Sequence, residues 1–427
     1  MNVTTELADL EESIRRIPRR SPRAVAGILT GLLIAGLLTF LLGISAEQPV
    51  RAWEIYLVNF LFWTGLAQAG VVFGAIYDLC NARWGPVIKR VAIGMGSFLP
   101  ITLLLYVPLF FGRSWLYPWV RHPIPEKAAW LNVPFFFSRN GLGLAMMVVL
   151  SLLYLYYNLR PQLGRALQRS LIPATPLYAR LTRGWQGFEA EHQRSRRVLG
   201  VLGPAILVAY AVVFSLLGFD LIMSLDPHWY SSLFGGYFFM SSLYLGLAGI
   251  AVVTIVLRMT LGLERWITAT HFHDLGKLLF GFDMLVIGLV WAQYIVIWYG
   301  NITEETQYVI LRTQVLPWAL FSWVALMAGF VGPLIVFFSR RAKQDPFALL
   351  PMGLAIAGGI WVERYVLVVP ALWTGPAAPL GIPELLISLG FASAAILSYL
   401  AFIRLFPILP LPDHLPAALE SPHSSQR

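Results

Sequence analysis

About ten stretches of the sequence are apolar over roughly twenty residues each, the length that an α-helix needs to cross the hydrocarbon core of a bilayer. Inside lipid a backbone must satisfy its own hydrogen bonds, so such stretches form helices. Composition agrees, because 58% of the residues are hydrophobic and only 12% are charged. The sequence therefore predicts an all-α polytopic membrane protein with about ten transmembrane helices. The expected spans are 24–44, 55–77, 88–111, 136–158, 199–222, 235–257, 274–299, 312–338, 347–370 and 384–406.

The distribution of basic residues predicts how these helices are oriented. The segment 1–23 is rich in arginine, and short loops rich in Lys and Arg usually stay in the cytoplasm. Alternating sides from there places the arginine-rich loop 159–198 inside. It places the loops 223–234 and 371–383, which have no Lys or Arg, outside. Both termini are then expected in the cytoplasm. The arginines of the first segment are Arg15, Arg16, Arg19, Arg20 and Arg23.

The net charge and the cysteine count argue against several classes of function. A net charge of +9 on a soluble protein would suggest nucleic acid. Here most basic residues lie in loops that face anionic lipid, so no nucleic-acid partner is expected. The single cysteine, Cys80, cannot hold an iron–sulfur cluster or attach a c-type haem. None of the seven histidines lies in the middle of an expected span, which argues against a b haem. We therefore expect no cofactor or metal held by this chain's own ligands.

Ionisable residues at membrane depth are the main candidates for function, because a charge in lipid is costly. Asp220 lies near the outer end of span five and Asp283 near the middle of span seven. Glu363 and Arg364 lie in the outer half of span nine. Adjacent residues of a helix point about 100° apart, so we expect these two to face different partners. The alternative is an ion pair that only locks helix packing.

Asp283 has the surroundings that most favour proton transfer. No basic residue lies one helical turn away, and Lys277 is six residues earlier, about 240° around the helix. A carboxyl in mid-membrane without a cation is expected to be protonated or hydrogen-bonded, which suits a proton relay.

Further titratable residues lie near the two membrane surfaces, where a proton pathway through the membrane would begin and end. Asp226 and His228 lie in the outer loop after span five. His273, Asp274 and Lys277 lie at the cytoplasmic start of span seven. The alternative for this second group is interfacial snorkelling of long polar side chains.

A tripeptide that occurs in two of the expected spans suggests internal repeats. The tripeptide Gly-Leu-Ala begins at Gly65 in span two and at Gly246 in span six, and both spans should run from outside to inside. Spans two to five and six to nine would then be parallel repeats.

Three segments resemble a membrane subunit of the bacterial alternative complex III, which is a quinol:electron-acceptor oxidoreductase. That subunit belongs to the NrfD/polysulfide-reductase membrane-anchor superfamily. The resemblance covers spans two to nine. The segments are FDLIMSLDPHWYSSLFGGYFF (Phe219 to Phe239), LNVPFFFSR (Leu131 to Arg139) and HDLGKLLFGFDMLVIGLVWAQYIVIWYGNITEET (His273 to Thr306).

The resemblance implies an architecture. It implies two four-helix bundles, which here would be 55–223 and 224–371, with flanking helices in 24–54 and 372–427. It also implies a location in the bacterial plasma membrane.

The resemblance implies partners as well. These are a sister NrfD-like membrane subunit, an iron–sulfur subunit and a multihaem cytochrome c subunit, in addition to lipids. The haem c groups and iron–sulfur clusters would be held by those partners. The sequence resembles the second of two related membrane subunits, for which quinol or menaquinol is a possible ligand, whereas the better-supported quinol site is in the sister subunit.

The mechanistic hypothesis is a proton pathway with an outer exit, an inner relay and a cytoplasmic mouth. The outer exit consists of Asp220, Asp226 and His228. The inner relay consists of Asp283, Glu363 and Arg364, and the cytoplasmic mouth of His273, Asp274 and Lys277. Carboxyl and imidazole groups suit this role because burial and charge partners can move their proton affinity across neutral pH. Arg139, at the outer start of span four, would anchor a quinone headgroup or a partner subunit. The alternatives are a standalone secondary transporter and a purely structural membrane anchor.

Overall fold

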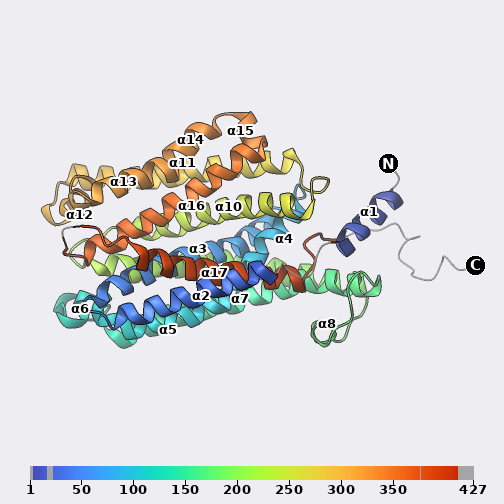
Figure 1. Ribbon diagram of the computed structural model, residues 1–427, viewed down its shortest axis with the longest axis horizontal. Helices are drawn as coiled ribbons and strands as arrows, with labels where there is room; N and C mark the ends of the chain where they lie inside the picture. Colours follow the sequence, from blue (N-terminus) through green and yellow to red (C-terminus); the bar gives the residue numbers. More distant parts are fainter. Residues whose placement is uncertain (1–2, 17–22, 376, 412–427) are drawn as a thin grey trace, which may run out of the picture.

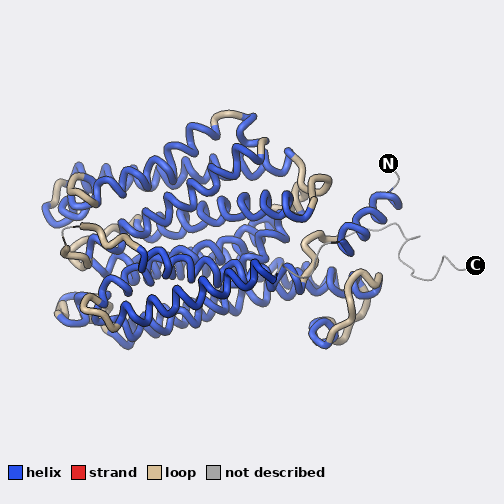
Figure 2. Tube along the Cα trace, in the orientation of Figure 1, coloured by secondary structure: helices blue, strands red, loops and turns tan. Residues whose placement is uncertain are grey.

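The computed structural model describes residues 3–16, 23–375 and 377–411, which form helices and loops with no strand among them (Figures 1 and 2). Ten helices within these residues are long and apolar enough to cross a membrane, which confirms the predicted all-α polytopic fold. Arg19, Arg20 and the tail after residue 411 lie outside the described residues.

The ten candidate spans follow the predicted ones closely. Seven consist of one main helix or of one helix with a short extension, and three are interrupted. They are α2 (Arg23–Ile44), α3 (Pro49–Leu79), α4–η1–α5 (Pro86–Leu116), α7 (Val133–Gln168), α9–η3–η4 (Phe188–Leu225), α10 (Phe234–Leu261), α11 (Ala269–Gly300), α13–η5–α14 (Trp318–Phe337), α16–η6 (Pro346–Ala371) and α17 (Ile382–Leu405). Short helices outside them are α1 (Val3–Arg16), α6 (Pro118–Arg121), α8 (Pro176–Leu181), α12 (Thr303–Thr313) and α15 (Arg340–Gln344).

The eighth span begins later than predicted. Residue 312 belongs to the separate helix α12, and the span begins at Trp318 instead. Pro317 lacks a backbone N–H and disfavours helical geometry at the residue before it, so the two helices do not merge.

The helices pack as two groups with two helices beside them (Figure 1). The first helix group consists of α3, α4–α5, α7 and α9, and the second consists of α10, α11, α13–α14 and α16. Helix α2 packs on α17, and α17 also packs on α3. The most buried spans, α3 and α10, lie against each other at the centre.

Small residues allow α3 and α10 to approach closely. A Cβ on Gly246 would lie 2.1 Å from the Cβ of Ala69, and a Cβ on Gly65 would lie 3.0 Å from the Oγ of Ser242. Residues 65 and 69 therefore meet residues 242 and 246 in order, so the two helices run in the same direction. Close approach over small residues is a common way for helices to pack in lipid.

The bundle has two ends, which we name by the helices that lie there. The α12 end also carries α6, whereas the α8 end carries α1 and the last described residues of the chain (Figure 1). At the α8 end the predicted loop 159–198 is largely helical, because α7 continues to Gln168 and α9 begins at Phe188. A buried ion pair between Arg160 and Glu191, 2.7 Å long, joins the two helices there.

Candidate functional site

Asp220 is a buried carboxylate whose acceptor positions are all occupied. It lies on the π-helical segment η3 (Gly218–Ile222) and is fully buried. Arg139 donates two hydrogen bonds to it, each 2.7 Å long. Asn140 donates a third at 2.7 Å and the indole of Trp130 a fourth at 3.0 Å. Each carboxylate oxygen thus accepts two bonds, which uses the roughly four acceptor positions of the group.

The structure therefore brings together two residues that the sequence placed in different roles. The sequence predicts that Arg139 anchors a quinone headgroup or a partner subunit and that Asp220 passes protons. A bidentate, fully hydrogen-bonded pair of this kind fixes α7 against the end of α9. Its geometry favours structural locking, with neither side chain left free for a ligand.

Glu363 and Arg364 pair with each other. Arg364 Nη1 lies 2.6 Å and 2.9 Å from the two carboxylate oxygens of Glu363. The expectation that the two face different partners is therefore wrong, because the long arginine side chain reaches back to its neighbour. Tyr237 donates a 2.5 Å hydrogen bond to Glu363, and Arg364 donates to Ser241 at 2.7 Å.

Asp283 contrasts with both of these carboxylates. It is fully buried, and neither of its carboxyl oxygens has a hydrogen-bond partner of good geometry among the described residues. The phenol of Tyr244 lies close by and interacts with it electrostatically. However, the Tyr244 hydroxyl donates to the carbonyl of Gly329, 3.2 Å away.

One face of α10 connects these groups. Tyr237, Ser241 and Tyr244 are spaced by four and three residues, so they lie on the same side of the helix. Tyr237 contacts Glu363, and Tyr244 lies beside Asp283. A search for ionisable residues at membrane depth does not find this row, because its members are uncharged at neutral pH. Its only signal was the helical spacing of hydroxyl groups in an otherwise apolar span.

Near the α12 end, a stack of aromatic side chains lies between the row of hydroxyl groups on α10 and Asp226. Trp229 is buried and stacks on Tyr308 of α12, with ring centroids 3.9 Å apart. Arg312 covers Tyr308 as well, with its guanidinium carbon 3.4 Å from the ring centroid. The Tyr308 hydroxyl is buried without a hydrogen bond among the described residues. It interacts electrostatically with both Asp226 and Glu363.

The chemistry of Tyr308 follows from this burial. Loss of water raises the pKa of the Tyr308 phenol above its ordinary value, so the group stays a neutral hydroxyl that can donate and accept. Asp226 is half-buried and His228 is exposed in the adjoining loop. Tyr308 therefore stands between the buried Glu363 and the exposed surface of the α12 end.

The predicted cytoplasmic mouth lies at the α8 end. Lys277 and Asp274 form an ion pair 2.6 Å long, with the lysine more than half exposed. His273 is half-buried, and its Nδ1 atom has no hydrogen-bond partner among the described residues. Ten residues separate His273 from Asp283, about 15 Å along the helix. No hydrogen bond between described side chains bridges that distance.

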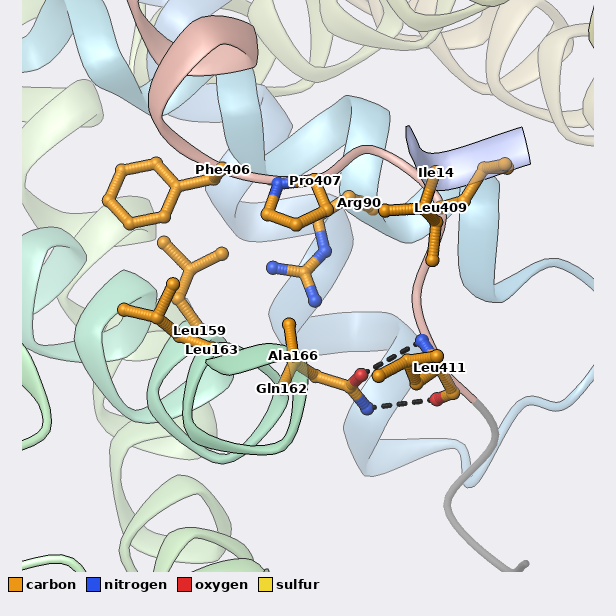
Figure 3. Close-up of a pocket in the computed structure, with 10 residues that line it drawn as sticks. All are labelled: Ile14, Arg90, Leu159, Gln162, Leu163, Ala166, Phe406, Pro407, Leu409 and Leu411. Atoms are coloured by element: carbon orange, nitrogen blue, oxygen red, sulfur yellow. Dashed lines mark hydrogen bonds between the residues drawn. The ribbon is translucent and has the colours of Figure 1, made fainter. Parts of the chain in front are cut away.

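The pocket at the α8 end contains none of the predicted site residues. It is lined by α1, α4, α7 and the chain after α17, and Figure 3 shows the Gln162 side chain exchanging two hydrogen bonds with the backbone of Leu411. The bonds are 3.1 Å and 2.9 Å long. This pocket marks where the end of the described chain docks.

Comparison with known protein families and with curated proteins gives no match. Within the described residues, no group of three or more His, Cys, Asp and Glu side chains could hold a metal ion. Fold and site together define the class as a polytopic helical membrane protein with titratable groups buried between its helices.

Proposed function

We propose that this chain is a membrane subunit of a bacterial quinol:electron-acceptor oxidoreductase of the alternative complex III type, and that its second helix group carries protons. The observation that carries the proton role is the row of hydroxyl groups on α10, in which Tyr237 bonds to Glu363 and Tyr244 lies beside the unpaired Asp283. The three segments that resemble the complex III subunit support the assignment to that complex.

The proton route is a sequence of exchanges between neighbouring groups. Ionised, Asp283 would be an uncompensated buried charge, so it is the group best suited to hold a proton in mid-membrane. Tyr237 and Tyr308 offer hydroxyl groups between Glu363 and the half-buried Asp226. From there the proton reaches the exposed His228, whose imidazole can bind and release it at the surface of the α12 end.

The rest of the complex supplies the redox chemistry in this proposal. Oxidation of quinol releases electrons and protons together, and the electrons pass to iron–sulfur clusters and c-type haems of the partner subunits. The sister membrane subunit holds the quinol site, because Arg139 is fully engaged by Asp220 here. The chain lies in the plasma membrane with the α8 end and both termini toward the cytoplasm.

Purification through a tag on this chain tests the assembly. We expect a mild-detergent preparation to show a c-type haem spectrum and, by mass spectrometry, to contain iron–sulfur and cytochrome subunits. A colourless, homogeneous preparation would overturn the assignment and favour a standalone transporter.

Substitution of Asp283 tests the proton route. In proteoliposomes containing the complex, Asp283→Asn should lower the number of protons released per electron while the haem content stays unchanged. Glu304→Gln, at an exposed position of α12, is the matched control and should change neither. An unchanged proton stoichiometry in Asp283→Asn would favour a purely structural anchor.

A further inference from the structure

Glu54 is a second buried carboxyl without a partner, in a different part of the molecule. It lies on α3, at the α12 end, and is 1% exposed. Both of its carboxyl oxygens lack a hydrogen bond among the described residues. It stands one residue before the predicted second span, 55–77, because the helix begins earlier than predicted, at Pro49.

The cation nearest to Glu54 already forms an ion pair with another carboxylate. Arg51, one helical turn before Glu54, forms a bidentate pair with Glu384 of α17, with Nη2 and Oε2 2.8 Å apart. Glu384 also accepts a 2.8 Å hydrogen bond from the backbone N–H of Gly381. Glu384 is therefore compensated, whereas Glu54 is not. The Arg51 side chain is 37% exposed, so the pair reaches the edge of the bundle.

A third helix completes the surroundings of Glu54. Tyr365 of α16 is buried, its hydroxyl has no partner among the described residues, and it interacts electrostatically with Glu54, Glu384 and Arg51. In the part of the chain that the structure describes, the charged and titratable groups that interact with Glu54 are the Arg51 guanidinium, the Glu384 carboxylate and the Tyr365 phenol. Arg51 binds Glu384 and acts on Glu54 only through its charge.

We propose that Glu54 is a proton-binding site separate from the Asp283 route, and that Arg51 alternates between Glu384 and Glu54. While Arg51 binds Glu384, Glu54 is a neutral carboxylic acid, because a second buried negative charge would have no partner. When the Glu54 proton moves to the Glu384 carboxylate, Arg51 turns to the new carboxylate on Glu54. Each state contains one ion pair and one protonated acid, so charge and protons balance.

This inference does not depend on the redox complex. Helix α16 carries Glu363 toward α10, whereas its Tyr365 lies with Glu54 of α3 and Glu384 of α17. Glu363 and Glu54 therefore lie at different helix interfaces. Failure of the complex to assemble would leave the chemistry of Glu54 unchanged.

Infrared difference spectroscopy of the purified full-length chain tests the proposal. At neutral pH the wild type should show the C=O stretch of a protonated carboxyl that Glu54→Gln removes and the exposed control Glu304→Gln retains. Glu384→Gln frees Arg51 for Glu54, so it should also remove the Glu54 band, whereas Arg51→Gln should keep it. A band that survives Glu54→Gln would overturn the proton site. A band that survives in Glu384→Gln would overturn the sharing of Arg51.

A second measurement needs no variant. Dicyclohexylcarbodiimide attacks protonated carboxyl groups in apolar surroundings, and peptide mass spectrometry locates the adduct. We expect an adduct on Glu54 and none on Glu384. The reverse pattern, or an adduct on neither residue, would contradict the proposed protonation.

Discussion

Asp220 and Asp283 are equally buried, yet their surroundings are opposite. Both side chains are fully excluded from solvent. Asp220 accepts four hydrogen bonds of 2.7 to 3.0 Å, two of them from a guanidinium, whereas neither oxygen of Asp283 has a partner in the described chain. Burial alone therefore does not identify a functional carboxyl in a membrane protein. What distinguishes the two is whether the chain has supplied compensating donors.

The difference also distinguishes the helix contacts that the two acids make. In the first, Arg139 of α7 compensates the carboxylate at the end of α9 and fixes two helices together. In the second, Asp283 of α11 faces α10, and the hydroxyl that lies beside it donates to Gly329 instead. Asp220 therefore holds two helices together, whereas Asp283 is available for a proton.

The largest expected effect separates these two acids by stability. Asp220→Ala leaves the nearly buried Arg139 without its carboxylate, and breaking such a pair costs about 3–5 kcal/mol of the free energy of unfolding. Asp283→Asn removes no ion pair, so its cost should be about 1 kcal/mol or less. Thermal unfolding of the purified chain in detergent measures both. Equal losses would contradict the distinction between a locking and an available carboxyl.

Substitution of Glu363 is expected to lower the free energy of unfolding by less than Asp220→Ala and by more than Asp283→Asn. It binds the fully buried Arg364 and accepts a hydrogen bond from Tyr237. Glu363→Gln keeps an acceptor but removes the charge, so we expect a loss of about 1.5–3 kcal/mol, the range for hydrogen bonds to charged groups. The same unfolding assay measures it against Glu304→Gln, which should be neutral. A loss as small as that of the control would show that Arg364 finds other compensation.

A glycine that packs against the backbone of Gly329 sharpens the comparison further. A Cβ on Gly359 would lie 2.3 Å from the backbone nitrogen of Gly329, whose carbonyl accepts the Tyr244 hydrogen bond. Gly359→Ala should therefore cost about 1–3 kcal/mol by overpacking and should disturb Tyr244. Gly358→Ala is the matched control, because nothing lies within 4 Å of its new Cβ. Similar unfolding midpoints for the two variants would contradict the close helix contact.

The fold was largely predictable because transmembrane helices are local features of the sequence. Twenty apolar residues in lipid can form only a few structures, and the ten spans follow from that constraint. The eighth span was placed too early because α12 is a short helix beside the span that the apolar pattern does not separate from it. Its boundary depends on Pro317 rather than on hydropathy.

The candidate site was only partly predictable because pairing is a tertiary property. The isolation of Asp283 could be predicted from the absence of a basic residue one turn away. The pairing of Arg139 with Asp220 joins residues 81 positions apart, and that of Arg51 with Glu384 joins residues 333 apart. No spacing rule connects such residues. Charged side chains at predicted span ends deserve equal weight with those in the middle, as Glu54 illustrates.

The smallest expected effect concerns the predicted mouth at the α8 end. The ion pair of Lys277 with Asp274 is exposed, so Lys277→Gln should change the free energy of unfolding by about 0.5 kcal/mol or less. About 15 Å of helix without a connecting hydrogen bond separates this region from Asp283, so proton stoichiometry should also stay near the wild-type value. The proteoliposome assay measures it beside Asp283→Asn. A loss of proton release as large as that of Asp283→Asn would mean that Lys277 and Asp283 act in one continuous path. The proton route would then extend along α11 to the α8 end.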